Sequence, residues 1–74
     1  MLWNMTQIKV GDIVRHVFDN ERLRVKRIYK GDHEGSAVAT CEEIDKGKNK
    51  VNIWDQYVYS IRVSHVQNLI LDEK

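Results

Sequence analysis

The sequence predicts an all-β protein, a small, partly open five-stranded antiparallel barrel with one 3₁₀ turn before the last strand. The strongest observation is a period of two between residues 51 and 63, which indicates a strand with one buried face. Its apolar residues share one parity: Val51, Ile53, Tyr57, Tyr59, Ile61 and Val63. Several shorter runs are separated by glycine-rich or polar turn signals, and no segment has the 3.6-residue period of an amphipathic helix.

The first half of the chain predicts three strands. A short strand over 8–10 leads into the turn Gly11-Asp12, because glycine tolerates positive φ and aspartate bonds to neighbouring backbone. The next strand spans 13–18 and ends at the polar loop 19–22. The third strand covers 23–29.

That third strand contains a change of phase. Leu23 and Val25 share one face, but Ile28 falls on the other. A bulge near Lys26-Arg27 would restore the alternation, and bulges are common where small barrels bend.

The second half predicts the closing strands of the barrel. Gly, Asp and Lys mark its turns, and a segment too short for an α-helix suits a 3₁₀ turn. In chain order we expect a loop at 30–35, a strand at 37–44, an exposed turn at 45–50, the alternating stretch at 51–63 with a break near 55–56, a 3₁₀ turn within 63–68 and a strand at 69–71.

Size and composition predict one domain over residues 1–74, with a lead-in at 1–6 and a frayed tail at 72–74. Cys41 is the only cysteine, so no intramolecular disulfide can form, and a reducing, cytoplasmic setting is favoured. We expect Cys41 to be a buried strand residue. No apolar run is long enough to span a membrane, and no signal peptide is recognisable. A net charge of +1 argues against a general polyanion binder.

The core follows from these strand phases. We expect the inward residues to be largely buried, and we expect Ile61→Ala to cost about 2–4 kcal/mol. The predicted core is Val10, Ile13, Val25, Ile28, Ile61, Val63, Val66 and Leu69.

The segment from Ile8 to Val14, with its Val-Gly-Asp-Ile-Val sequence, resembles the opening of bacterial SH3-like barrels. Residues 23–28 resemble their second strand, and residues 57–71 resemble their ending. Over residues 8–71 the chain is similar to the small YodC-like proteins and, more distantly, to KOW-type barrels. The resemblance implies an SH3-like barrel and brings no catalytic residues.

Aromatic residues give the first candidate site. Trp54 is out of phase with Val51 and Ile53, which places it on the outer face beside Asn52 and Gln56 if the strand is regular. Trp and Tyr are enriched at interface hot spots. Burial over one end of the barrel is the alternative for Trp54. The candidate partner-binding residues are Trp54, Tyr57 and Tyr59.

Basic residues give the second candidate site. Arg24 and Lys26 share the outward face of one strand, and Arg15 lies on a neighbouring strand. Cationic patches contact phosphates, although interspersed carboxylates also fit a surface of cross-strand ion pairs. The candidate nucleic-acid residues are Arg15, Arg24, Lys26 and Arg27.

No motif predicts chemistry. His16, His33 and His65 lack metal-ligand spacing, and nothing marks Cys41 with a histidine as a catalytic pair. We therefore expect no cofactor, no metal and no enzymatic activity. The first hypothesis is a protein-binding or accessory module that is able to self-associate. The second is a KOW-like nucleic-acid-binding module, and the third is an enzyme assembled at an oligomer interface.

Overall fold

Strands and 3₁₀ turns make up the regular structure of the computed structural model, which describes residues 8–32, 36–51, 54 and 56–72. Within these residues there is no α-helix, and the predicted all-β class is confirmed. The elements are β1 (Ile13–His16), β2 (Arg22–Tyr29), β3 (Val38–Glu42), η2 (Ile44–Lys46), β4 (Lys48–Lys50), β5 (Tyr57–Tyr59), β6 (Ile61–His65), η3 (Val66–Asn68) and β7 (Leu69–Leu71).

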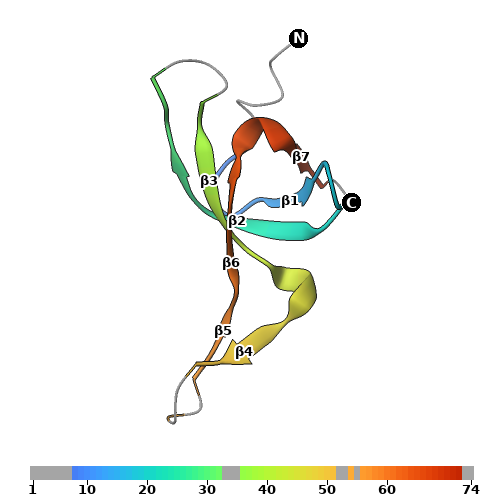
Figure 1. The fold of residues 1–74 in the computed structure, drawn as a ribbon, viewed down its shortest axis with the longest axis vertical. Coiled ribbons are helices and arrows are strands. Elements are labelled where there is room, and N and C mark those ends of the chain that lie inside the picture. Colours follow the sequence, from blue (N-terminus) through green and yellow to red (C-terminus); the bar gives the residue numbers. More distant parts are fainter. Residues whose placement is uncertain (1–7, 33–35, 52–53, 55, 73–74) are drawn as a thin grey trace.

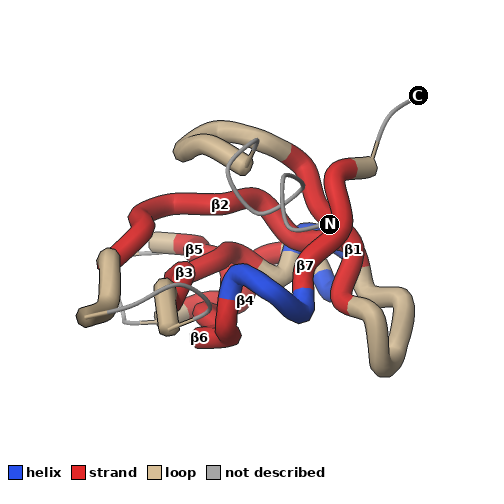
Figure 2. The backbone as a smooth tube through the Cα atoms, turned by 90° about the horizontal axis from the view of Figure 1, so that it is seen from above, coloured by secondary structure: helices blue, strands red, loops and turns tan. Residues whose placement is uncertain are grey.

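Five strands form one antiparallel sheet in the order β6-β3-β2-β1-β7. The sheet curves around the core without closing, and η3 links its two edge strands (Figures 1 and 2). This is the predicted small, partly open five-stranded barrel, with the 3₁₀ turn directly before the last strand.

A second, two-stranded sheet extends from the barrel. Strands β4 and β5 pair as a hairpin that projects beyond the five-stranded sheet (Figure 1), and the molecule measures 47 × 28 × 19 Å. At the far end of the β4–β5 ladder the Val51 N–H donates to the backbone oxygen of Gln56 at 2.9 Å. Gln56 lies outside the strands, as the predicted break near 55–56 requires, while Asp55 lies outside the described residues. The exposed turn expected at 45–50 is wrong, since η2 and β4 occupy it.

The turn before β1 is joined to the bulge in β2. Gly11 has a φ of 96°, and the Asp12 carboxylate accepts the Lys9 N–H at 2.8 Å. Val25 then forms two backbone hydrogen bonds to this turn. Its N–H donates to the backbone oxygen of Asp12 at 2.9 Å, and its backbone oxygen accepts the Gly11 N–H at 2.8 Å. The β2–β3 register shifts between Val25 and Arg27, which confirms the predicted bulge.

The core lies on the concave side of the sheet. Val25, Val66 and Leu69 are buried as predicted, and so is Cys41. Ile28 packs against this cluster, while Ile13 is partly exposed. The buried apolar residues are Ile8, Val14, Leu23, Val25, Ala39, Cys41, Val66 and Leu69.

Three predicted core residues are wrong: Val10, Ile61 and Val63 are 62%, 54% and 64% exposed. Val10 lies in the turn before β1. The other two fail because the register of β6 with β3 sets Arg62 and Ser64 opposite the buried residues of β3. Even-numbered residues of β6 therefore face the core, and odd-numbered ones face outward.

The ends of the described chain also differ from expectation. Ile8 is buried, but residues 8–10 do not form the predicted strand. Asp72, expected in a frayed tail, donates its N–H to the Ile13 oxygen at 2.9 Å, and its carboxylate pairs with Arg15 at 3.3 Å. The lead-in at 1–6 and residues 73–74 lie outside the described residues.

Candidate functional site

Strands β2, β3 and β6 present one convex surface, which we call the outer face. The strand registers align its residues in rows that cross the sheet. On this face β2 carries Arg24, Arg27 and Tyr29, and β6 carries Ile61, Val63 and His65. The rows are Arg24–Glu42–Ile61, Arg27–Thr40–Val63 and Tyr29–Val38–His65.

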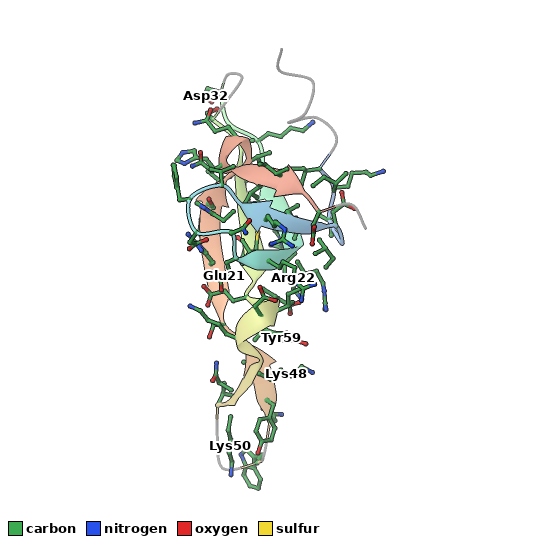
Figure 3. The ribbon with its side chains drawn as sticks, turned by 90° about the vertical axis from the view of Figure 1, so that its right-hand side faces the viewer. Glu21, Arg22, Asp32, Lys48, Lys50 and Tyr59 are labelled. Carbon is green, nitrogen blue, oxygen red and sulfur yellow. The ribbon has the colours of Figure 1, made fainter. Side chains whose placement is uncertain are left out.

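The projecting hairpin continues this face. Lys48 lies opposite Tyr59, and Lys50 lies opposite Tyr57, so the two pairs share one side of the hairpin. The Tyr59 ring is 5.6 Å from the Arg24 guanidinium carbon and 5.3 Å from the Lys48 ammonium nitrogen. Figure 3 shows Tyr59 and Lys48 at the base of the hairpin and Lys50 toward its tip. Cation–π attraction at Tyr59 thus connects hairpin and barrel.

An apolar row runs along this face from β5 into β6, and we call Tyr57, Tyr59, Ile61 and Val63 the exposed stripe. Tyr57 is 53% exposed, and Tyr59 is half-buried between its two cations. The sequence assigns this same parity to a buried face, and that interpretation is wrong. Arg24 and Lys48 partly cover Tyr59, while Tyr57, Ile61 and Val63 each stay more than half exposed.

Trp54 lies at the turn of the hairpin and is 75% exposed. Its exposure agrees with the prediction, but the cause differs: Trp54 is a turn residue and not part of an unbroken strand. Its expected neighbour Asn52 lies outside the described residues, as does Ile53. The three predicted partner-binding residues, Trp54, Tyr57 and Tyr59, all belong to this hairpin.

The four predicted nucleic-acid residues do not form one uninterrupted patch. Arg24 and Lys26 both pair with Glu42, at 3.2 and 3.6 Å. Arg15 pairs with Asp72, on the side of the sheet where β1 meets β7. Arg27 has no ion pair among the described residues.

Sequence reasoning missed an ionic cluster that ties the edge strand β6 to the β1–β2 turn. Arg62 Nη1 donates to Asp19 Oδ2 at 2.8 Å and to Glu21 Oε1 at 2.7 Å. The hydrogen bond from Arg62 lowers the pKa of Asp19, and the same bond raises the pKa of Arg62. Lys46 of η2 lies 3.8 Å from the second oxygen of Glu21. The cluster spans the gap that the open sheet leaves.

A buried histidine–serine pair is the other polar feature that the sequence did not reveal. His16 Nε2 lies 2.9 Å from Ser64 Oγ, and both side chains are buried. His16 Nδ1 accepts the Phe18 N–H at 3.2 Å. The proton therefore sits on Nε2 and is donated to Ser64, so Nε2 has no lone pair with which to activate the serine. In this arrangement the pair stabilises the core and is not a nucleophile–base dyad.

We expect Ser64→Ala to lower the free energy of unfolding by about 1–3 kcal/mol, because it leaves the buried His16 Nε2–H without an acceptor. The control is Ser60→Ala, whose hydroxyl accepts an exposed hydrogen bond from Asn49; we expect this change to cost less than about 1 kcal/mol. Urea denaturation measures both, and ¹⁵N NMR reports the His16 tautomer. A protonated Nδ1 in the wild type would contradict the assignment.

Other site types find no support in the described part of the chain. No group of three or more His, Cys, Asp or Glu residues is placed to hold a metal ion there. The same residues form no helix that is long and apolar enough to cross a membrane. Comparisons with protein-family models, with curated proteins and with solved structures found no match. The resemblance to YodC-like and KOW-type barrels stays a prediction.

Proposed function

We propose that this protein is a non-enzymatic binding module of the cytoplasm, and that it docks another protein on the exposed stripe. One observation carries the proposal: apolar residues with strict strand alternation are exposed. Ile61 and Val63, which lie side by side on the outer face, are 54% and 64% exposed. Monomeric proteins rarely expose contiguous apolar surface without a binding role.

The hairpin supports the same proposal. Tyr57 is the end of the stripe on the hairpin, and Trp54 lies beyond it at the turn; both side chains are more than half exposed. Aromatic side chains supply large contact area at interface centres. Because the hairpin projects from the barrel, these residues extend the surface that is open to a partner seated on β6 (Figure 1).

Nucleic-acid binding is the second candidate function, and the surroundings of Tyr59 favour it. An aromatic ring beside Arg24 and Lys48 is the kind of group that stacks on a base of a single strand. Against this candidate, Arg15, Arg24 and Lys26 are ion-paired within the chain. If nucleic acid binds here, its affinity should fall steeply with salt concentration.

Affinity capture from lysate of the source cells, with and without nuclease treatment, tests the proposal. We compare the wild type with the stripe double variant Ile61→Ser/Val63→Thr and with the control Val17→Thr, a change at an exposed residue outside the outer face. We expect a protein that the wild type and control retain and the stripe variant loses. Capture that ignores the stripe, or that disappears with nuclease, would contradict the proposal.

A further inference from the structure

Strand β6 is an edge of the barrel. Among the described residues it pairs with β3 on one side and with no strand on the other. An edge strand carries a row of unpaired backbone N–H and C=O groups, which is a template for adding another strand.

Two hydrogen bonds determine which residues of β6 present these groups. The Glu43 N–H donates to the backbone oxygen of Ser60, and the Val66 N–H donates to the backbone oxygen of Ala37, both at 2.9 Å. These bonds bracket the β3–β6 ladder, in which hydrogen-bonded and non-hydrogen-bonded pairs alternate. Even-numbered residues of β6 therefore bond to β3, and odd-numbered residues direct their backbone groups away from it.

The outward backbone groups and the outward apolar side chains thus belong to the same residues, Ile61 and Val63. Proteins usually protect such an edge with proline, a bulge or a charge that an added strand would bury. The charged residue on β6 is Arg62, and it is already satisfied by Asp19 and Glu21 of its own chain. Covering it would therefore not leave an unpaired charge.

The surroundings of this edge are basic. Arg27 lies in the same row as Val63, and Lys48 and Lys50 line the adjoining hairpin. Among the described residues, and with the ion-paired ones included, the face has five cationic side chains and one carboxylate, a net charge of +4, while the formal net charge of the whole chain is +1. These charged residues are Arg24, Lys26, Arg27, Lys48, Lys50 and Glu42.

We propose that β6 binds an extended, acidic segment of a partner protein by strand addition. The segment pairs its backbone with the N–H and C=O groups of Ile61 and Val63. Its apolar side chains on one parity pack on the exposed stripe, and its carboxylates meet the cations of the face. This inference rests on the proposed function and adds to it the mode of binding and the chemistry of the partner.

A polypeptide fits this edge better than the other candidates. A nucleic acid would complement the positive charge but has no groups spaced to pair with a strand edge. A second copy of this chain could pair through β6, but it would bring the same net positive face and no acidic complement.

Proline at Val63 tests the mode directly. Val63→Pro removes an N–H that points away from β3, so the ladder of the barrel is kept, as edge strands allow. The matched control Val63→Ala shortens the side chain and keeps the N–H. Selection of displayed random twelve-residue peptides on the full-length protein provides the probe. We expect selected peptides with alternating apolar and acidic residues, and binding about tenfold weaker to Val63→Pro than to Val63→Ala.

A selected peptide, resynthesised, gives a test that does not depend on the folding of a variant. N-methylation of its backbone at one parity should abolish binding, and methylation at the other parity should not, since one set of N–H groups faces β6. Lys48→Gln should weaken binding more than Lys9→Gln, a matched change outside the face.

The outcomes separate the two proposals. Stripe-dependent capture of a protein, with Val63→Pro binding peptides as well as Val63→Ala, overturns strand addition and leaves the proposed function standing. Loss of stripe-dependent capture overturns the proposed function itself. Three results would each overturn the acidic-strand proposal. The wild type selects no peptides other than those that Val63→Pro also selects; the selected peptides are basic; or the wild type dimerises with rising concentration and Val63→Pro does not.

Discussion

Replacing Leu23 with alanine is expected to lower the free energy of unfolding by about 3–5 kcal/mol. Leu23 has no exposed surface, lies opposite the buried Val14 of β1, and is among the largest fully buried side chains. A domain of this size has a total stability of only about 4–11 kcal/mol. Leu23→Ala should therefore leave a marginally folded protein, and urea denaturation at 10–25 °C measures the loss.

The matched change is Ile61→Ala, which removes an aliphatic side chain from a strand of the same sheet. Because Ile61 is 54% exposed, the expected cost is under about 1 kcal/mol, mostly lost strand preference. A buried odd face would instead make this change cost about 2–4 kcal/mol. Similar losses for the two variants would show that the stripe is covered in the isolated protein.

Local patterns predicted most of the fold. The phase of Ile28 against Val25 located the bulge, and Gly11-Asp12 located the turn that bonds to it. The 3₁₀ turn and the last strand also lie at their predicted positions, because the segment before the last strand is too short for an α-helix. These features depend on neighbours in sequence, so the sequence contains their cause.

The sequence could not predict which face of β6 is buried, because hydrophobic alternation does not depend on what the strand packs against. Ser64 enters the core since it finds His16 from β1, 48 residues away. Arg62 turns inward since Asp19 and Glu21 neutralise it. Pairs this distant in sequence leave no periodic signal. The outward apolar row was visible in the sequence, but its exposure was not.

The candidate site was predicted in its parts and not in its arrangement. Tyr59 and Arg24 were assigned to different hypotheses, one for protein and one for nucleic acid. In the fold the Arg24 guanidinium lies over the Tyr59 ring, because β5 leads into β6, and Ile61 of β6 lies in the same row as Arg24. The separate aromatic and basic sets therefore share one face, and Arg15 alone of the predicted residues lies apart with Asp72.

Alkaline pH is expected to destabilise the protein through Cys41. Burial raises the pKa of this thiol from 9.0 to about 11, and the nearby charge of Arg62 only partly opposes the effect. Between these two values the unfolded chain has lost the thiol proton while the folded chain still holds it. Stability therefore falls as pH rises, by about 2–3 kcal/mol in total, and the contribution is intact below pH 9.

Urea denaturation of the wild type and Cys41→Ala at pH 8 and pH 11 isolates this contribution, because every other titrating group is common to both proteins. Cys41→Ala should cost stability at pH 8, where it leaves a small cavity, and should lose about 2–3 kcal/mol less than the wild type between the two pH values. At pH 8 the wild-type Cys41 should react with Ellman's reagent only as fast as the protein opens. The folded protein keeps this side chain buried and protonated, and only an exposed thiolate reacts. Equal pH dependence of the two proteins, or immediate labelling of native Cys41, would mean that the thiol reaches solvent through the gap beside Arg62, and that the ionic cluster does not close the barrel.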